Sequence, residues 1–358
     1  MLTASEQTSA QQARTDEAPA DRLLGEPKPA RQQLVTVFGG SGFVGRHVVR
    51  ALVQRGYRVR VAVRRPDLAN FLQPLGMVGQ IHAVQANLRY PASVAAAVKG
   101  ADAVVNLVGV LSEKGRQTFS SVQAQGARAV AEACRAAGIG RLVHVSALGA
   151  ASDSRSLYAR SKAEGEAAVL KAGGQAVVFR PSIMFGPEDG FFNRFAMLAR
   201  MMPVLPLIGG GETTFQPAFV GDVAEAIARA VDGKVEGGRV YELGGPEAKS
   251  FRELLEYICE VTGRSRAFVP LPFPLARLQA RILEIVDTLT LGLLPDALML
   301  TRDQVTLLET DNVVGESAKA EGRTFEAIGI EPVSVEAVVP SYLWRYRKTG
   351  QFETARIR

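Results

Sequence analysis

The chain has 358 residues, of which 47% are hydrophobic and 22% charged, and its formal net charge is +6. This size and apolar fraction allow a sizeable core, which excludes wholesale disorder, collagen-like repeats and a disulfide scaffold. The excess charge is local, because residues 1–33 carry a net charge of −1 and residues 341–358 a net charge of +4. The near-neutral body therefore gives no reason to expect nucleic-acid binding.

Cysteine usage and hydropathy predict a chain that works in a reducing compartment. Cys134 and Cys259 lie far apart on predicted helix faces, which is typical of buried structural thiols. The longest stretch without Asp, Glu, Lys or Arg, residues 68–88, contains too many Asn, Gln and His residues to span a membrane. The N-terminus lacks the pattern of a signal or transit peptide, so we expect a cytoplasmic location.

The pattern along the first half of the chain alternates between strands and helices. Residues 1–33 lack apolar periodicity and are predicted to be disordered. Strands are predicted at residues 34–38, 58–63, 81–85, 103–108, 141–146 and 176–180, and helices at residues 43–55, 91–99, 117–137 and 157–170. This alternation predicts a parallel sheet covered by helices on both faces, which is a doubly wound α/β fold.

Beyond residue 180 the alternation breaks down. The region with Pro203, Pro206 and the glycines at 209–211 is predicted to be an irregular loop, followed by a helix at 223–231, a strand at 239–243 and a helix at 251–262. We expect residues 34–180 to form the core, residues 181–272 a smaller α/β cap with elements that return to the core, and residues 273–358 a C-terminal extension.

The extension begins with an amphipathic pattern. Leu275, Leu278, Ile282, Ile285, Val286 and Leu289 fall on one face of a helix. The favoured interpretation is a helix that packs this face on its own domain. The alternative is a face that meets a partner protein or a membrane surface.

A glycine cluster follows the first predicted strand. Gly39, Gly42 and Gly45 have one spacing used in dinucleotide-binding turns, and Gly40, Gly42 and Gly45 have another. Glycine permits a tight turn and close approach of the backbone to a pyrophosphate, which would sit at the helix N-terminus. The strand, turn and helix context predicts a Rossmann-type site for a dinucleotide.

The end of the second predicted strand indicates which dinucleotide is bound. A site selective for NAD places a carboxylate there to accept a hydrogen bond from the ribose 2′-hydroxyl, but this chain has Arg64 and Arg65. Two guanidinium groups suit a 2′-phosphate, so we expect NADPH. The alternative is that both arginines are solvated and that Asp67 takes part of the acidic role.

A third group of residues resembles a reductase site. Tyr158 and Lys162 share one face of a predicted helix, and Ser146 ends the fifth predicted strand. Lys162 is expected to hydrogen-bond the ribose and to lower the pKa of the Tyr158 phenol, while Ser146 would hold a substrate carbonyl. The three histidines, at positions 47, 82 and 144, have no metal-ligand spacing, so no metal site is expected.

With these motifs in place, the chain resembles the extended and atypical short-chain dehydrogenase/reductase superfamily over residues 34–265. Several stretches that generic reductases lack extend the resemblance to the family of accessory subunits of respiratory complex I known as alpha-subcomplex subunit nine. These stretches are residues 181–189, 192–193, 216–217, 220–223, 301–305 and 342–346.

The resemblance implies an NADPH-binding subunit without turnover, which assembles with other complex I subunits on the peripheral arm near the membrane, on the cytoplasmic side of the inner membrane. The alternative is a free NADPH-dependent reductase of a small carbonyl, sugar-nucleotide or quinone-like substrate. In either case the reductase-like residues are Ser146, Tyr158 and Lys162. The expected cofactor contacts are Gly39, Gly40, Ser41, Gly42, Phe43, Val44, Gly45, Arg64, Arg65, Asn87, Leu88, Leu107, Val108, Gly109, Ser146, Tyr158, Lys162, Pro181 and Ile183.

The closing segment is both basic and aromatic. Tyr342, Trp344 and Tyr346 alternate with Leu343, Arg345 and Arg347. We expect its rings and charges to meet a partner subunit or an anionic lipid surface, with a solvated, disordered end as the alternative.

Overall fold

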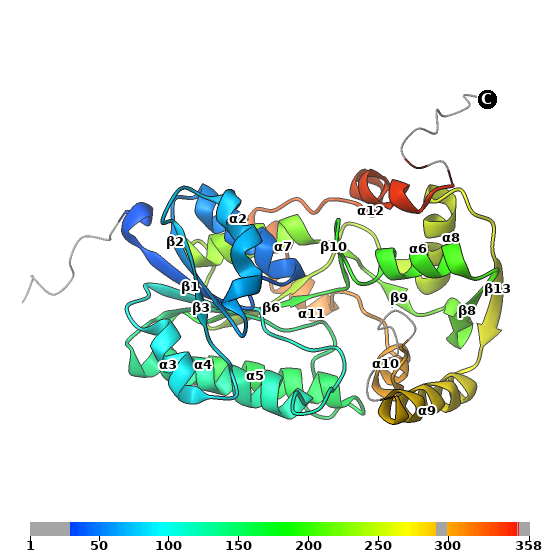
Figure 1. Ribbon diagram of the computed structural model, residues 1–358, viewed down its shortest axis with the longest axis horizontal. Coiled ribbons are helices and arrows are strands. Elements are labelled where there is room, and N and C mark those ends of the chain that lie inside the picture. Colours follow the sequence, from blue (N-terminus) through cyan, green and yellow to red (C-terminus); the bar gives the residue numbers. More distant parts are fainter. Residues whose placement is uncertain (1–28, 291–298, 349, 351–358) are drawn as a thin grey trace, which may run out of the picture.

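The computed structural model describes residues 29–290, 299–348 and 350. Figure 1 shows a lobe built around a large sheet and, beside it, a smaller lobe of short strands and helices. Of the segment predicted to be disordered, residues 1–28 lie outside the described residues, and Ala30–Gln32 form one turn of 3₁₀ helix.

Seven parallel strands form the large sheet, in the order β11-β6-β5-β4-β1-β2-β3. Their bounds are β1 Leu34–Phe38, β2 Arg58–Val63, β3 Ile81–Gln85, β4 Ala103–Asn106, β5 Arg141–Val145, β6 Val177–Pro181 and β11 Arg239–Leu243. The predicted doubly wound parallel sheet is therefore confirmed. The last strand of the sheet, β11, follows β6 only after about sixty residues of chain. Part of the second lobe is formed by this intervening segment.

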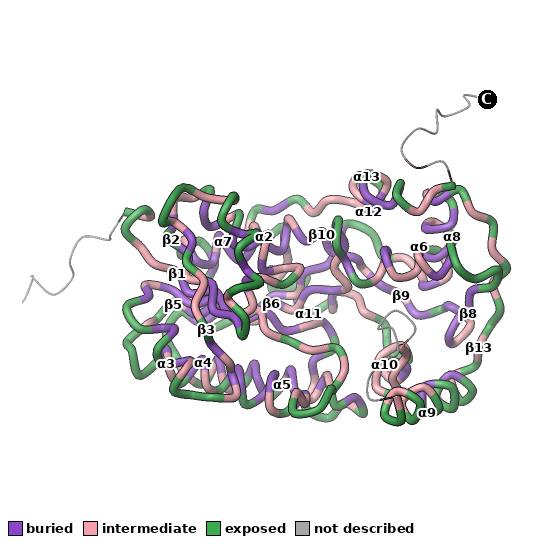
Figure 2. The backbone as a smooth tube through the Cα atoms, viewed as in Figure 1, coloured by how far each residue is buried: buried purple, intermediate pink, exposed green. Residues whose placement is uncertain are grey.

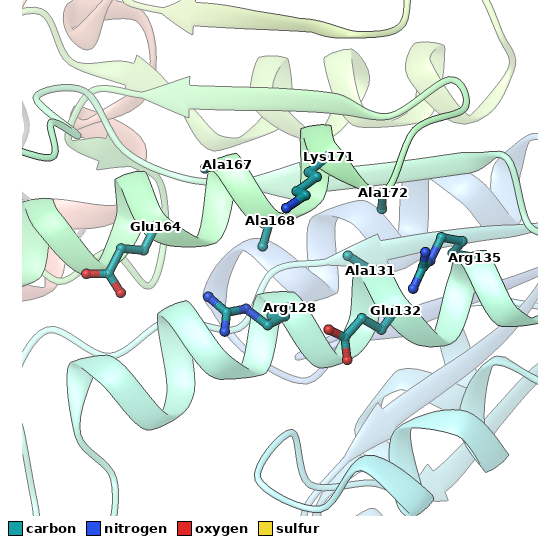
Figure 3. A pocket seen from close by; sticks show the side chains of 9 residues that line it. All are labelled: Arg128, Ala131, Glu132, Arg135, Glu164, Ala167, Ala168, Lys171 and Ala172. Atoms are coloured by element: carbon teal, nitrogen blue, oxygen red, sulfur yellow. The ribbon is translucent and has the colours of Figure 1, made fainter.

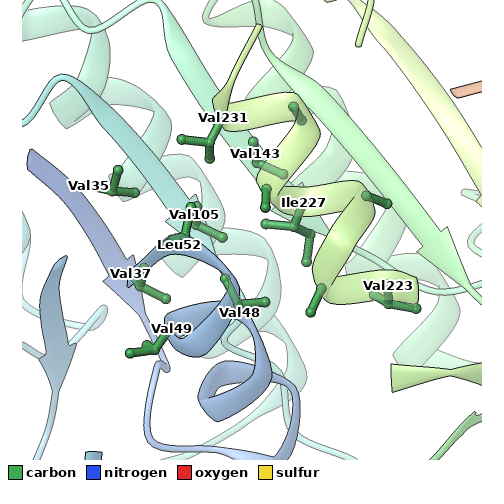
Figure 4. Close-up of a cluster of buried hydrophobic side chains, with 14 of the residues drawn as sticks. Val35, Val37, Val48, Val49, Leu52, Val105, Val143, Val223, Ile227 and Val231 are labelled. Carbon is green, nitrogen blue, oxygen red and sulfur yellow. The ribbon is translucent and has the colours of Figure 1, made fainter. Parts of the chain in front are cut away.

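Helices cover both faces of the sheet. On one face, α2 (Phe43–Gln54) and α7 (Val220–Val231) pack their valine and isoleucine side chains on alternate residues of the strands (Figure 4). On the other face lie α3 (Pro91–Val98), α4 (Gln125–Ala136) and α5 (Leu157–Lys171). Alternate side chains of each strand point to opposite faces, so β-branched residues fill both layers of the core.

Some element boundaries differ from those predicted. The helix expected from residue 117 begins with a π-helical turn, Ser120–Ala124, and β4 ends at Asn106 rather than at residue 108. β4 ends there because the Asn106 side chain accepts a hydrogen bond from Val108 N (3.2 Å), which turns the backbone out of the sheet. The 3₁₀ segment Pro66–Leu75 was not predicted.

The smaller lobe contains α6 (Phe192–Met201), α8 (Phe251–Val261) and a pair of parallel strands, β8 (Val204–Ile208) and β13 (Ala267–Leu271). The prediction of an irregular loop at 203–211 is wrong, because residues 204–208 form β8 and only Gly209–Gly211 form an irregular turn. A two-stranded sheet tolerates Pro206 because each of its strands is an edge strand. The remaining short pairs are β7 (Met184–Phe185) with β10 (Ala218–Phe219) and β9 (Thr214–Phe215) with β12 (Lys249–Ser250).

The C-terminal part of the chain packs back on both lobes. It forms α9 (Phe273–Leu289), α10 (Arg302–Leu307), α11 (Glu316–Ala320), the 3₁₀ turn Glu326–Ile328, α12 (Val335–Val338), α13 (Pro340–Leu343) and the 3₁₀ turn Trp344–Tyr346. Among the described residues, no helix is long and apolar enough to cross a membrane. Cys134 and Cys259 are free and buried, and burial raises the pKa of the Cys134 thiol to about 12, as expected for a structural thiol.

The closing aromatic segment contacts its own chain. The Tyr342 hydroxyl donates to the buried carboxylate of Asp189 (2.6 Å), and Arg347 donates to the Val261 carbonyl (2.8 Å). The prediction that these side chains face a partner or a lipid surface is therefore wrong for the buried Tyr342, whereas Arg347 is half-buried. Arg356 and Arg358, which contribute to the net charge of residues 341–358, lie outside the described residues.

In the amphipathic helix α9, the face that was predicted to be buried is exposed. It packs on its own lobe through Ala276 and Ala280, which are fully buried. The predicted apolar face is instead solvent-exposed, as the colouring of α9 in Figure 2 shows: more than half of the side chain is exposed at Leu275, Leu278, Ile282, Ile285 and Leu289. The interpretation that this face packs on its own domain is wrong. We refer to these five residues as the α9 seam.

Candidate functional site

The glycine turn between β1 and α2 has the geometry that a dinucleotide requires. Gly39 adopts a φ of +78°, and Gly42 N donates to Gly39 O at 3.1 Å, which closes the turn. A Cβ at Gly45 would lie 2.3 Å from Gly39 O, so only glycine allows the helix to pack this closely on the turn. A Cβ at Gly42 would instead meet only Gly39 O, at 3.4 Å.

The start of α2 lies open above this turn. Its N-cap residue is Gly42, and no side chain caps the first turn. The N–H groups of Phe43, Val44 and Gly45 therefore belong to a helix N-terminus that attracts an anion. Ser41 is half-buried in the same turn. Gly40 packs under it, where an added Cβ would lie 3.0 Å from a Val61 methyl group.

Arg64 and Arg65 leave the end of β2 together, but their environments differ. Both side chains are exposed, and Arg65 forms an ion pair with Asp67 at 3.1 Å. Within the described residues, Arg64 has no such partner. Arg64 is thus the better placed of the two to meet an incoming phosphate, whereas Arg65 and Asp67 form an exposed ion pair beside it.

The residues predicted to border the adenosine follow β3 and β4. Asn87 forms a local turn, in which its side chain accepts from Arg89 N (3.1 Å), whereas the Leu88 side chain is buried against Gly126 in the core. Beyond β4, Val108 lies beside Gly39, where a Cβ on the glycine would be 3.2 Å from its methyl group. The turn and the segment that contains Leu107, Val108 and Gly109 are therefore neighbours at the carboxyl edge of the sheet.

Tyr158 and Lys162 lie on α5, whose first residue follows the N-cap Ser156. Lys162 is buried, and its Nζ donates to Val145 O (3.2 Å) and lies next to Gly109, where a Cβ would be 3.2 Å away. The structure thus brings Lys162 to the predicted nucleotide path. Burial lowers the pKa of Lys162 to about 8, although Glu166 opposes this shift.

The Tyr158 phenol does not have the expected acidity. Burial, and secondarily the negative charge of Asp303, raise its pKa to about 12. The expectation that Lys162 lowers this pKa is therefore wrong for the protein without nucleotide. The lysine Nζ lies 5.8 Å from the centre of the phenol ring, and with a pKa of about 8 it is largely protonated near pH 7, but the burial of the phenol outweighs this charge.

Three buried polar groups near Lys162 lack a hydrogen-bond partner among the described residues: Gln123 Oε1, His144 Nε2 and Ser146 Oγ. Leaving buried polar groups unpaired costs free energy, so such a cluster indicates a place where a ligand completes the bonding. Gln123 and His144 were not predicted. Burial lowers the pKa of His144 to about 3, and its Nδ1 lies 3.2 Å from Asn106 Nδ2, so the ring is neutral.

A C-terminal segment closes this edge of the sheet, which the sequence did not indicate. Residues 301–315, which we call the strap, pass from α10 across the ends of α5 and β6. Asp303 accepts from Leu157 N (2.7 Å) and Tyr158 N (3.2 Å) at the start of α5. Asn312 Oδ1 accepts from Ile183 N (3.2 Å), just beyond Pro181 at the end of β6. The only signal in the sequence was the family-specific stretch at 301–305, which carries no known chemistry by itself.

The residues at this edge fit a dinucleotide. The positive-φ turn, the uncapped helix N-terminus, the unpaired Arg64 and the unsatisfied polar cluster near Lys162 lie along the ends of β1, β2, β4 and β5. No three His, Cys, Asp or Glu side chains in the described part of the chain are grouped as a metal ion would require. A surface hollow between α4 and α5 contains none of the predicted site residues (Figure 3). Its lining alternates alanines with charged side chains such as Arg128 and Glu132.

Comparison with known proteins agrees with this geometry. Residues 35–244 match the model of the NAD dependent epimerase/dehydratase family. In the solved structures, an NADPH-dependent quinone oxidoreductase from Escherichia coli, in complex with NADPH, superposes with a TM-score of 0.65 over 87% of this chain and 99% of its own, at 21% identity. At that identity the likeness shows the fold.

Two curated relatives are more similar in sequence. A ceramide reductase of Caulobacter vibrioides is 39% identical over 175 residues, which cover 49% of this chain and 54% of the relative. The mitochondrial NADH dehydrogenase [ubiquinone] 1 alpha subcomplex subunit 9 of Arabidopsis thaliana is 34% identical over 320 residues, which cover 88% of this chain and 79% of the relative. Because this second match includes the strap and α9 as well as the sheet, the chain belongs to the NAD dependent epimerase/dehydratase family and, within it, to the family of alpha subcomplex subunit 9.

Proposed function

We propose that this chain is a non-catalytic accessory subunit of respiratory complex I that holds NADPH as a structural component. The similarity to alpha subcomplex subunit 9 over 88% of the chain supports this assignment.

The nucleotide would be held along the carboxyl edge of the sheet. The glycine turn and the start of α2 would receive the pyrophosphate, and Arg64 the 2′-phosphate. Lys162 would hydrogen-bond the nicotinamide ribose. Ser146 Oγ and Gln123 Oε1, which have no hydrogen-bond partner among the described residues, would complete their bonding at the same end. NADPH supplies a hydride when it acts as a redox cofactor. The group that would donate the accompanying proton in this chain, the Tyr158 phenol, has a pKa far above neutral.

The state of Tyr158 argues against turnover. A phenol that donates a proton during hydride transfer benefits from a pKa near the working pH. In this chain burial and the Asp303 carboxylate raise the pKa of Tyr158 to about 12, and burial leaves Lys162 with a pKa of about 8. In the chain without nucleotide the phenol is thus a weak acid at neutral pH, which supports a role of the pair in holding the ribose.

The single observation that carries the proposal is the exposed α9 seam. Its residues are spaced by three and four positions in turn, which is the spacing of a seam between two packed helices. Arg277 and Arg281 balance Glu284 and Asp287 on the same helix, so α9 lacks the excess of basic residues typical of helices that bind anionic lipid. We therefore assign the seam to an apolar helix of another complex I subunit, at the peripheral arm near the membrane.

The test is recovery of the complex after mild detergent extraction. Ile282→Glu puts a charge in the centre of the seam, where the side chain is 53% exposed, so folding stays intact while association is lost. Val78→Glu, on a fully exposed loop of the other lobe, is the matched control and retains association. Recovery of the unmodified chain without any respiratory-chain subunit overturns the proposal. Binding of the chain to vesicles of phosphatidylcholine and cardiolipin that Ile282→Glu abolishes would assign the seam to lipid instead.

A second function is favoured by one specific observation. Ser146, Tyr158 and Lys162 keep the order and the α5 placement of a reductase site, and a ceramide reductase is 39% identical over about half of this chain. A free NADPH-dependent reductase of a small carbonyl, sugar-nucleotide or quinone-like substrate is therefore the alternative. NADPH oxidation by the purified chain that Tyr158→Phe abolishes would support the reductase. Unchanged NADPH content and complex I activity in Tyr158→Phe would support the accessory subunit.

A further inference from the structure

The strap, residues 301–315, is the element that the proposed function leaves unused. Thr301 and Gln304 cap the start of α10 reciprocally, since the Thr301 hydroxyl accepts from Gln304 N and the Gln304 side chain accepts from Thr301 N. This capping box pairs two backbone N–H groups at the start of α10 and so stabilises the first turn of that helix. Arg302 and Asp303 lie between Thr301 and Gln304, and their side chains contact different parts of the molecule.

Asp303 connects the strap to the nucleotide helix. Its Oδ1 accepts from Leu157 N (2.7 Å), and its Oδ2 accepts from the Ser156 hydroxyl (2.8 Å) and Tyr158 N (3.2 Å). A carboxylate that satisfies these donors also neutralises the positive end of α5, which is stabilising. The first turn of α5, which contains Tyr158 and leads to Lys162, is thus held by a residue from the C-terminal part of the chain.

Arg302 and Val305 connect the strap to α9. Arg302 donates from its backbone N (2.9 Å) and its Nε (2.8 Å) to the two carboxylate oxygens of Glu284 on α9. Val305 is fully buried in one cluster with Ala276 and Ala280, the two residues through which α9 packs. The buried side of α9 therefore rests on the strap, while its seam faces outwards.

The strap also bonds to two loops that border the nucleotide path. Gln304 Nε2 donates to the carbonyl of Leu111, which follows the segment containing Gly109. Asn312 accepts from the Ser182 hydroxyl (2.7 Å) and Ile183 N (3.2 Å) beyond β6. The elements that would contact the nicotinamide end of the dinucleotide thus share the strap as a common support.

We propose that the strap couples nucleotide occupancy to the position of α9, with Asp303 as the positioning residue that joins the two. This inference rests on the proposed function, because it needs both a bound nucleotide and a docking role for α9. Nucleotide binding at Lys162 fixes the first turn of α5, which fixes α10 through Asp303 and α9 through Arg302 and Val305. By linkage, a partner bound to the α9 seam strengthens NADPH binding by the same factor that NADPH strengthens partner binding.

The experiment is amide hydrogen exchange of the full chain with and without NADPH, read by mass spectrometry. We expect NADPH to slow exchange in the first turn of α5 and also in α9, by about fivefold or more. In Asp303→Ala the α9 response disappears, and the dissociation constant for NADPH rises by about tenfold. Asp153→Ala, an exposed aspartate three residues before Ser156 in the same loop, is the matched control and behaves as the unmodified chain.

Each other outcome decides against a specific step. Failure of the unmodified chain to bind NADPH overturns the proposed function together with the coupling. NADPH binding that leaves exchange in α9 unchanged overturns the coupling alone. An α9 response that persists in Asp303→Ala removes Asp303 from the connection. If Asp303→Ala does not fold, Glu284→Gln tests the other end, because α5 must then respond to NADPH while α9 does not.

Discussion

Replacement of Gly42 by alanine separates the nucleotide site from the fold. Gly42 has a φ of −75° and a ψ of −179°, which an alanine adopts without strain. Its Cβ would have one neighbour within 4 Å, Gly39 O at 3.4 Å, which is an ordinary contact. The stability of the nucleotide-free chain is therefore expected to change by less than about 1 kcal/mol, with a small gain from the more restricted unfolded chain.

The effect on the loaded protein follows from the same geometry. The methyl group would occupy the side of the turn where a pyrophosphate approaches the backbone, and we expect it to weaken NADPH binding by about tenfold. At a nucleotide concentration of 100 times the original dissociation constant, NADPH stabilises the unmodified chain by about 2.7 kcal/mol. The variant would keep about 1.4 kcal/mol, and the difference lowers the melting temperature of the loaded protein by about 2 °C for a chain of this length.

The assay is thermal unfolding of both proteins across a series of NADPH concentrations. Gly45→Ala is the contrasting variant, because its Cβ would lie 2.3 Å from Gly39 O and 2.5 Å from the carbonyl carbon of Gly40. These are backbone atoms that cannot move aside, so Gly45→Ala is expected to lose about 1 to 3 kcal/mol even without nucleotide. Equal NADPH-dependent stabilisation in Gly42→Ala and the unmodified chain would refute the placement of the pyrophosphate at this turn.

The remaining predictions concern cofactor choice and pH. Arg64→Ala is expected to weaken NADPH binding by about tenfold and NADH binding very little, and Arg65→Ala to have a smaller effect because Asp67 already engages Arg65. Equal losses for NADPH and NADH in titrations followed by nucleotide fluorescence would contradict this. His144 has a pKa of about 3 in the folded chain and 6.5 in the unfolded chain. Between these two pH values the unfolded chain binds more protons, so the free energy of unfolding decreases as the pH is lowered. Urea unfolding between pH 6.5 and 4 is expected to show a loss of about 3 kcal/mol from this group that His144→Gln lacks, and parallel profiles would count against it.

The sheet and the glycine turn follow from local sequence. Short β-branched runs such as residues 34–38 and 58–63 alternate with helical patterns, and each predicted strand of this kind pairs with a neighbour in the parallel sheet. The turn is recognisable because three glycines, Gly39, Gly42 and Gly45, fall within seven residues of chain, and the fold itself requires Gly39 for its positive φ and Gly45 for close packing. Such features can be predicted because the interactions that decide them lie close together in sequence.

The features that the sequence did not reveal depend on contacts between distant segments. β8 contains Pro206 and directly follows Pro203, and it forms a strand because it pairs with β13, some sixty residues later in the chain. The pKa of Tyr158 was expected to be lowered by Lys162, four residues away, but it is raised by burial and by Asp303, which is 145 residues away. The α9 seam has the pattern of a buried face, yet Ala276 and Ala280 take the buried position because small side chains let the helix approach Val305 closely.

The origin of Asp303 has a consequence for synthesis of the protein on the ribosome. The residue that holds the first turn of α5 lies 147 positions after Ser156, so it is made last among the parts of this site. At about 5 to 20 residues per second, roughly 7 to 30 seconds separate the two during translation. During that interval β6 and β11 are still being added to the sheet, and the start of α5 is capped only by its own Ser156. If Asp303 positions α5 as proposed, the strap must be synthesised before the nucleotide site has its finished geometry.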